Sequence, residues 1–314
     1  MKRILLSTAM VAGLSGAAGA ENIGVSMALF DDNFLTVLRN GIQEQASGME
    51  GVDVQIEDAQ NDVARQLDQI NNFIASGVDA IIVNPVDTSA TQAMTDAAAA
   101  GNVPLVFVNR EPVNVDTLPD NQAFVASDEK ESGTLETMQV CELLKAAGKT
   151  EANIYVMMGE LSNQAAVQRT ADIHDVMDSG NCGVTLNIID EQTANWQRDE
   201  AQDLMTNWLS SGTQFDALIS NNDEMAIGAI QAMKASGINM DDVVIGGIDA
   251  TQDGLLAMAA GELDVTVFQD AAGQGGGALD AALKLAKGEA VEQKVYVPFQ
   301  LVTPENMAEF AQSN

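Results

Sequence analysis

Short apolar runs alternate with amphipathic segments along the chain from residue 23 onward. In the first half, apolar or alternating runs predict strands at residues 23–29, 52–56, 80–83 and 104–108. Helical spacing between them predicts helices from residue 34, over residues 63–74 and over residues 90–100. The second half predicts strands at residues 123–127, 154–157, 184–189, 217–220, 243–248, 265–268 and 295–298, with a last helix at 278–285. Strands that alternate with helices in this way predict parallel sheets covered by helices on both faces.

The length of the chain indicates more than one lobe, because 314 residues exceed what a single hydrophobic core usually organises. The pattern pauses over residues 111–122, where Pro112, Pro119 and several Asp and Asn residues predict a non-regular crossing. No low-complexity linker divides the chain, which favours lobes joined by several crossings. We therefore predict an α/β protein with two doubly wound, parallel-sheet lobes.

The N-terminus has the three parts of a secretory signal peptide. Lys2 and Arg3 are followed by an apolar stretch over residues 4–14 and by the sequence Ala18-Gly19-Ala20. This stretch is too short to span about 30 Å of hydrocarbon. We predict cleavage after Ala20 and a soluble mature protein outside the cytoplasm.

Composition excludes several classes of function. Forty-six acidic residues against fourteen basic ones give a net charge of −32, which repels nucleic acid and anionic lipids. His174 is the only histidine, so neither a histidine-rich metal site nor a Ser/His/Asp set is expected. The glycine-rich residues 273–277 lack the Lys-Ser/Thr ending of a phosphate loop. Cys141 and Cys182 could form a disulfide or stay free, because sequence does not give their separation.

Polar residues follow most of the predicted strands. These strand ends are Asp31-Asp32-Asn33-Phe34, Asn84-Pro85-Val86-Asp87, Asn109-Arg110-Glu111, Asn221-Asn222-Asp223, Asp249 and Gln269-Asp270. Ligands of open parallel sheets bind outside the carboxyl ends of the strands. Asn and Asp are also common helix N-caps, so any single one has an ordinary structural explanation. Their recurrence in both halves of the chain predicts a polar cleft.

Carboxylates, amides and a guanidinium that face one another suit a ligand with several hydroxyl groups. Each hydroxyl can donate to an Asp and accept from an Asn or Arg, so its hydrogen bonds are satisfied on desolvation. The apolar faces of a ring need flat partners, and aromatic residues make up only 4% of the chain. Phe34 and Trp196 both lie just after predicted strands, and we expect them at the ligand.

In order and spacing, several segments resemble the periplasmic sugar-binding proteins of the galactose- and ribose-binding type. They include DDNF, IIVNPVDTSA, VPLVFVNREP, SNNDEMAIGAI, FQDAAGQ and TPENMAEF. Together with VYVPFQLVTPEN, these segments look most like the branch that binds inositols and rhizopines. The resemblance covers essentially the whole chain after the signal peptide, and it implies a periplasmic protein.

The resemblance implies two lobes that close around a ligand and are joined by three hinge crossings, near residues 111, 269–271 and 298–300. The first lobe would then comprise residues 21–111 and 271–297, and the second residues 112–270 and 298–314. Expected ligand-binding residues are Asp32, Phe34, Asn84, Arg110, Asn163, Arg169, Trp196, Asn222, Asp249 and Gln269. Phe34 and Trp196 would sandwich the ring. Arg110 corresponds to an arginine of ribose-like members, where galactose-like members carry lysine, and Arg169 to an arginine that clamps a hydroxyl.

Two departures from the galactose-like pattern bear on the ligand. Asn163 and Ala165 stand where galactose-like members carry His and Asp, which favours a cyclitol over an aldohexose. The galactose-type calcium loop is replaced by residues 149–153, which supply no set of spaced oxygen ligands, so we predict no metal. No cofactor is expected either.

The resemblance implies a monomeric receptor of a membrane ABC permease that captures myo-inositol or a related cyclitol. An aldose receptor, which could also serve a chemoreceptor, is the alternative. A repressor-like sensor would need a DNA-binding segment where the signal peptide stands. A secreted enzyme could use Asp32 and Asp249 as paired carboxylates, but no nucleophile motif or cofactor fingerprint accompanies them.

Overall fold

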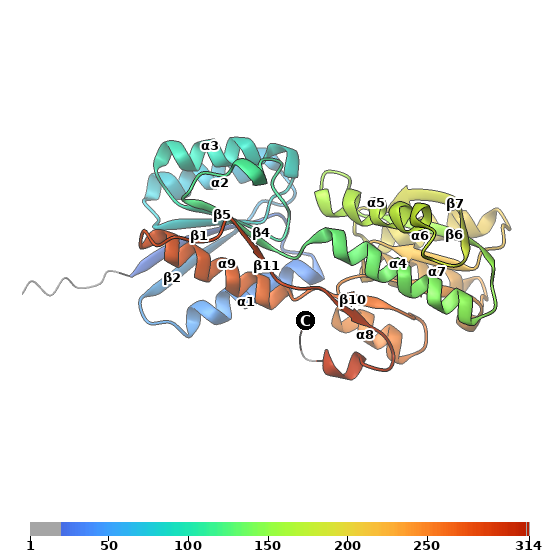
Figure 1. The fold of residues 1–314 in the computed structure, drawn as a ribbon. Coiled ribbons are helices and arrows are strands. Elements are labelled where there is room, and N and C mark those ends of the chain that lie inside the picture. The colour runs from blue at the N-terminus through green and yellow to red at the C-terminus, as the bar shows by residue number, and fades with distance from the viewer. Residues whose placement is uncertain (1–19, 312, 314) are drawn as a thin grey trace, which may run out of the picture.

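The computed structural model describes residues 20–311 and residue 313, so the predicted signal peptide lies almost entirely outside the described residues. The described chain forms two α/β lobes that lie side by side (Figure 1). Within this part of the chain, no helix is long and apolar enough to cross a membrane.

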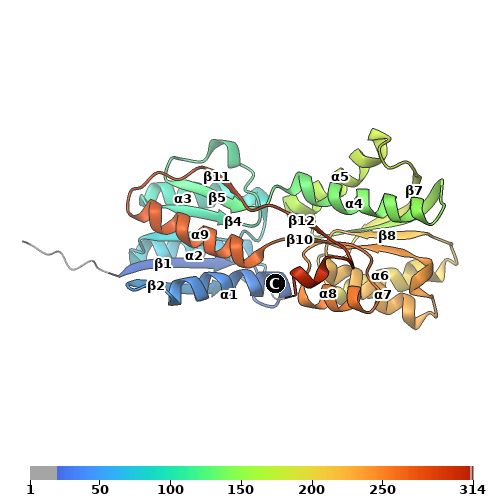
Figure 2. The same cartoon turned by 60° about the horizontal axis from the view of Figure 1, so that its bottom comes forward.

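The first lobe is built on a six-stranded parallel sheet with the order β11-β5-β4-β3-β1-β2. Its strands are β1 (Glu21–Met27), β2 (Val52–Asp58), β3 (Ala80–Val83), β4 (Leu105–Val108), β5 (Gln122–Ala126) and β11 (Lys294–Tyr296). Its helices are α1 (Asn33–Ser47), α2 (Val63–Ser76), α3 (Thr91–Gly101) and α9 (Ala271–Ala286). Helix α1 packs on α9, and α2 packs on α3. Figure 2 shows α9 among the helices of this lobe, although it follows the whole second lobe in the chain.

The second lobe has a four-stranded parallel sheet with the order β7-β6-β8-β9, joined through isolated bridges to β10, which pairs antiparallel with β12. Its strands are β6 (Glu151–Met158), β7 (Thr185–Thr193), β8 (Ala217–Ser220), β9 (Val244–Gly246), β10 (Thr266–Phe268) and β12 (Gln300–Val302). Its helices are α4 (Glu129–Ala146), α5 (Gln164–Ser179), α6 (Arg198–Ser210), α7 (Asp223–Ala235) and α8 (Gln252–Ala259).

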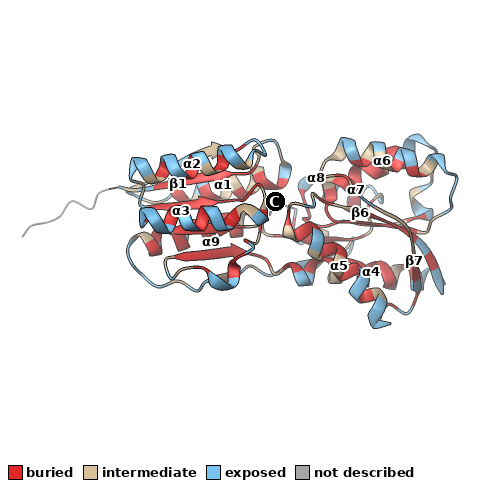
Figure 3. Ribbon diagram, turned by 90° about the horizontal axis from the view of Figure 1, so that it is seen from above, coloured by how far each residue is buried: buried red, intermediate tan, exposed pale blue. Residues whose placement is uncertain are grey.

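Burial follows the layers that the apolar pattern predicts. Strands β3, β4, β5 and β8 are buried at every position, while most helices also carry an exposed side; α7 is buried over most of its residues. Figure 3 shows this division, with the sheets mostly in red and the outer helix faces in pale blue. The amphipathic and the fully apolar runs therefore correspond to helices and central strands.

The first passage between the lobes lies later in the chain than we expected. We placed it near Glu111, but β5 pairs with β4 and β11 in the first sheet, so residues 112–126 belong to the first lobe. The irregular stretch before β5 is a loop that contains a short 3-10 helix (Val115–Thr117). After this loop the chain returns to the first sheet as β5. The chain enters the second lobe at residues 127–128, returns at 269–270 and passes again at 297–299.

The glycine-rich residues 273–277 lie inside α9, which begins at Ala271 and therefore starts earlier than the predicted residue 278. A Cβ atom on Gly275 would lie 2.4 Å from the carbonyl oxygen of Leu38 in α1. Close packing of α9 on α1 thus explains Gly275 and Gly276, and it overrides the low helix propensity of glycine.

Cys141 in α4 and Cys182, which follows α5, form a disulfide with an S–S distance of 2.03 Å and a Cα–Cα distance of 5.2 Å. The bond joins α4 to the turn that follows α5, and these two helices pack together on the second sheet.

Candidate functional site

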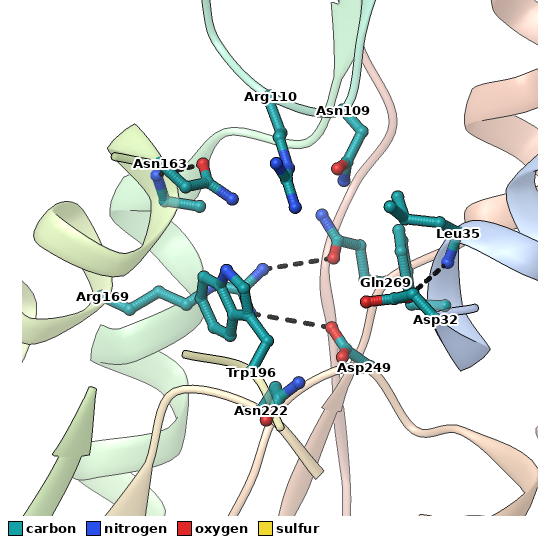
Figure 4. Close-up of a pocket in the computed structure, with 12 residues that line it drawn as sticks. Asp32, Leu35, Asn109, Arg110, Asn163, Arg169, Trp196, Asn222, Asp249 and Gln269 are labelled. Atoms are coloured by element: carbon teal, nitrogen blue, oxygen red, sulfur yellow. Dashed lines mark hydrogen bonds and ion pairs between the residues drawn. The ribbon is translucent and has the colours of Figure 1, made fainter. Parts of the chain in front are cut away.

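A small cavity of about 40 Å³ lies between the two lobes, where the carboxyl ends of strands from both sheets approach each other (Figure 4). Its lining residues are Asp32, Phe34, Leu35, Asn109, Arg110, Asn163, Ala165, Arg169, Trp196, Asn222, Asp249 and Gln269. The cavity therefore presents polar partners from both lobes to a small ligand.

Asp32 and Arg110 provide the charged groups of the first lobe. Asp32 caps α1, and its Oδ1 accepts a hydrogen bond of 2.8 Å from the Leu35 N–H. Burial raises the pKa of Asp32, against the opposing effects of that N–H and of Arg110. The Arg110 Nη1 donates to the carbonyl oxygens of Pro85 and Val86 at 3.0 and 3.1 Å. Backbone contacts therefore hold both side chains in place at the cavity.

Arg169 is the centre of a buried charge network in the second lobe. It forms a two-point ion pair with Glu129, with Nε–Oε2 and Nη2–Oε1 distances of 2.8 and 3.1 Å. Its Nη1 donates to the Asn221 carbonyl oxygen at 2.7 Å, and both partners of the ion pair are almost fully buried. Burial alone would lower the pKa of Arg169, but Glu129 raises it, so the guanidinium stays charged.

The same guanidinium orders two further cavity residues. Its Nη2 donates to Gln269 Oε1 at 3.2 Å, and its Nη1 lies 3.6 Å from Asp249 Oδ1. Figure 4 shows both contacts as dashed lines. Burial raises the pKa of Asp249 well above its usual range, although Arg169 opposes this effect. A ligand hydroxyl in the cavity can therefore meet a carboxyl, an amide and a guanidinium at one place.

Asn163 and Asn222 combine the two roles that the sequence left open. Asn163 Oδ1 accepts from the Ala165 N–H at 3.1 Å, and Asn222 Oδ1 accepts from the Met225 N–H at 3.0 Å. Each residue thus caps a helix and also lines the cavity. Because the oxygen of each amide is directed at the helix, the NH₂ group can serve as a donor to a ligand.

Trp196 and Phe34 bring aromatic surface to the cavity from opposite lobes. The Trp196 ring packs against Gly159, where a Cβ atom would lie 2.1 Å from the indole. The Arg169 guanidinium lies 5.6 Å from the centroid of the same ring. The indole Nε1 is buried and has no hydrogen-bond partner among the described residues. Trp196 therefore offers both a flat face and an N–H group.

Left-handed backbone conformations gather at the cavity. Asn109, Trp196 and Asp249 have φ angles of +67°, +67° and +118°, although none of them is glycine. Such conformations cost about 1–3 kcal/mol each and persist where the surrounding structure holds them. All three residues line the cavity.

Nine of the ten predicted site residues line the cavity, and Asn84 does not. Asn84 is fully buried behind the cavity, where its Oδ1 accepts from the Ala28 N–H and its Nδ2 donates to Val108 O and Asn109 Oδ1. It therefore supports the cavity from behind. Asn109, which belongs to the same strand-end pattern, lines the cavity, and we did not select it.

The two lobes also touch outside the cavity. Both the backbone N–H and the hydroxyl of Thr88 donate to the carbonyl oxygen of Ser162, at 3.0 and 3.1 Å. Asn33 Nδ2 donates to Glu224 Oε1 at 2.7 Å, and Arg198 Nε holds the other oxygen of Glu224 at 2.8 Å. These contacts describe a closed arrangement of the lobes.

Asp223 gives a testable electrostatic property to the wall behind the cavity. It accepts from the Thr266 hydroxyl at 2.7 Å and from the Thr251 N–H at 2.9 Å, and burial raises its pKa to about 7. Because this pKa lies above the value of 3.8 for the ordinary group, protonation favours the folded state. The stability that the folded protein gains from protonation of Asp223 is fully present below about pH 4 and is lost as the pH rises through 7.

We therefore expect the Asp223→Asn variant to show a smaller decline in melting temperature than the wild type between pH 4 and 8. Thermal unfolding across this range tests it, with Asp241→Asn at an exposed position as the control. Parallel pH profiles of the wild type and Asp223→Asn would contradict the assignment.

Comparison with known proteins agrees with this architecture. A family model described as a periplasmic binding protein domain matches residues 23–290. A Rhizobium meliloti protein named for rhizopine binding is 63% identical over 314 residues, all of both chains. An ABC transporter solute-binding protein from Bacillus halodurans, solved with bound myo-inositol, is 40% identical with a TM-score of 0.88, covering 96% of this chain and 100% of that one. A Caulobacter myo-inositol binding protein, bound to myo-inositol, is 27% identical with a TM-score of 0.83, covering 95% and 98%. With two lobes, a cavity between them and a match over most of its length, the chain belongs to the periplasmic binding protein family.

Proposed function

We propose that this protein is the periplasmic receptor of an ABC importer and that it captures myo-inositol or a related cyclitol by closure of its lobes. The observation that carries the proposal is the composition of the cavity wall. Two carboxylates, two guanidinium groups and several amides from both lobes surround the cavity. Closure around a polyol would satisfy its hydroxyl groups while removing them from water.

The residues at positions 163 and 165 support a cyclitol over an aldohexose as the ligand. The side facing Arg169 carries Asn163 and Ala165, an amide and a methyl group, in place of the His and Asp of galactose-like members. The relatives described above whose names or bound ligands concern rhizopine or myo-inositol support the same choice. An aldose receptor is the second candidate, since the remaining polar groups suit any small sugar.

A binding role is favoured over catalysis because the two carboxylates of the cavity are already engaged. Asp32 caps α1, and Asp249 lies beside Arg169. Membership of a family of solute-binding proteins supports the same conclusion. In the cell, the closed and loaded form would be the one that the permease recognises, and a chemoreceptor could recognise it as well.

Calorimetry on residues 21–314, unfolded and refolded to remove bound ligand, tests the proposal. Myo-inositol, scyllo-inositol, glucose, galactose and ribose form the panel. We expect micromolar or tighter binding of an inositol, with the aldoses at least a hundredfold weaker, about 2.7 kcal/mol. The Asp32→Asn variant should weaken the binding of whichever ligand binds, and this would show that the measured heat comes from binding in this cavity.

Each other outcome contradicts a defined part of the proposal. Tight binding of an aldose would keep the receptor and overturn the cyclitol. No binding across the panel would overturn the small-polyol class.

A further inference from the structure

A chain of buried side-chain amides runs behind the cavity of the first lobe. It begins at the backbone N–H of Ala28, which donates to Asn84 Oδ1 at 3.4 Å. A backbone N–H can only donate, so this contact fixes which end of the Asn84 amide is the oxygen. The Asn84 Nδ2 then donates to the Val108 carbonyl oxygen and to Asn109 Oδ1, both at 3.3 Å.

The chain continues through α9 to the first passage between the lobes. Asn109 Nδ2 donates to Gln274 Oε1 at 3.2 Å, and Gln274 Nε2 donates to Ser127 Oγ at 2.9 Å. Gln274 is fully buried and Ser127 is 2% exposed. Ser127 directly follows β5, at the point where the chain leaves the first lobe. One directed series of hydrogen bonds therefore joins a cavity residue to a hinge residue.

The series also determines what Asn109 presents to the cavity. Its oxygen is held by Asn84, and one hydrogen of its NH₂ group is held by Gln274, so the second hydrogen remains as a donor. Figure 4 shows the Asn109 amide directed toward the cavity beside Arg110. Without Gln274, the Asn109 amide would keep only its hydrogen bond from Asn84 and would be held less firmly in this orientation.

An ordinary packing role does not explain a glutamine at position 274. Its neighbours in α9 are alanine and glycine, which pack closely against α1. Burial of an amide costs free energy that an apolar side chain of the same length would avoid. The hydrogen bonds of Gln274 with Asn109 and Ser127 explain why a buried amide stands at this position.

We propose that Gln274 is a positioning residue that orients Asn109 for the ligand and couples it to the hinge at Ser127. Gln274 does not line the cavity, so it acts through Asn109. The inference rests on the proposed function for its ligand, but the orientation of Asn109 can be measured without any ligand.

The binding test is a double-mutant cycle with Gln274→Met and Asn109→Ala, using calorimetry with the inositol or sugar of the panel that binds. We expect Gln274→Met alone to weaken binding roughly tenfold. In the Asn109→Ala background, the same change should alter Kd by less than about twofold. Gln45→Met is the matched control, because Gln45 also contacts α9, through Gly276 and Asp280, without touching Asn109. It should leave Kd unchanged.

Equal weakening by Gln274→Met in both backgrounds would overturn the inference, because Gln274 would then act independently of Asn109. An unchanged Kd in the single variant would overturn it as well.

The ligand-free test is the NMR signal of the Asn109 side-chain NH₂ group, identified by its absence in Asn109→Ala. We expect slow hydrogen exchange of this group in the wild type and in Gln45→Met, and fast exchange in Gln274→Met. Equal exchange in all three proteins would overturn the inference even if no sugar of the panel binds. If no sugar of the panel binds but the exchange pattern is as expected, only the proposed ligand class is contradicted.

Discussion

Replacement of Arg169 by methionine should abolish ligand binding and lower the free energy of unfolding by about 3–5 kcal/mol. The guanidinium is 3% exposed and holds Glu129 by two hydrogen bonds. Removing it leaves a buried carboxylate without its charged partner, which is one of the most costly changes in a protein interior. It also releases Gln269 and Asp249, so two further ligand contacts lose their positions.

A second substitution separates the two effects. Combining Arg169→Met with Glu129→Gln removes the isolated charge, and we expect part of the stability to return while binding stays absent. Urea denaturation and calorimetry measure the two quantities. Arg198→Met is the control, since this arginine is about one-third exposed and its ion pairs with Glu224 and Asp253 should contribute less than about 1 kcal/mol. Wild-type affinity in Arg169→Met would contradict the site that we describe.

Removal of the disulfide should cause a similarly large loss of stability but leave ligand binding unchanged. Cys141 and Cys182 are 41 residues apart, and closing a loop of this length stabilises a fold by about 4 kcal/mol in the chain-entropy description. Cys141 lies twelve residues along α4 from Glu129, about 18 Å, so the bond is distant from the cavity.

The Cys141→Ala/Cys182→Ala variant tests this by urea denaturation and by calorimetry with the same ligand. Reduced wild-type protein, measured in parallel, separates the loss of the cross-link from the loss of two buried sulfur atoms. A changed Kd in both samples would mean that the disulfide also sets the geometry of the cavity.

The alternation of apolar and amphipathic segments was enough to predict the two parallel-sheet lobes, because periodicity reports directly on burial. It did not separate a lobe boundary from a long loop. The segment with Pro112 and Pro119 has the composition of either, and only the pairing of β5 with β4 decides that the chain returns to the first sheet. Pairing between distant segments is a tertiary property that local pattern does not contain.

Sequence reasoning selected nine of the residues that line the cavity but chose Asn84 in place of Asn109. The strand-end rule selects Asn84 and Asn109 equally, since both directly follow a strand. Their different roles arise from the backbone: Asn109 has a left-handed φ of +67° and lines the cavity, while Asn84 receives a hydrogen bond from the Ala28 N–H. A left-handed asparagine is common enough to be considered at a strand end, but sequence alone does not identify it.

Because α9 and β11 come late in the chain but belong to the first lobe, they determine when that lobe can be completed during synthesis. Strand β11 pairs with β5, about 170 residues earlier, and α9 covers α1 near the start of the chain. Most of the second lobe, by contrast, is contiguous between residues 129 and 268. The N-terminal lobe therefore begins to be made first but acquires its full core only after most of the second lobe has been made, and β12 (Gln300–Val302) completes the second lobe shortly afterwards. A nascent chain that ends before residue 271 has no finished N-terminal lobe. Such a delay keeps the N-terminal lobe incomplete until nearly the whole polypeptide has been made.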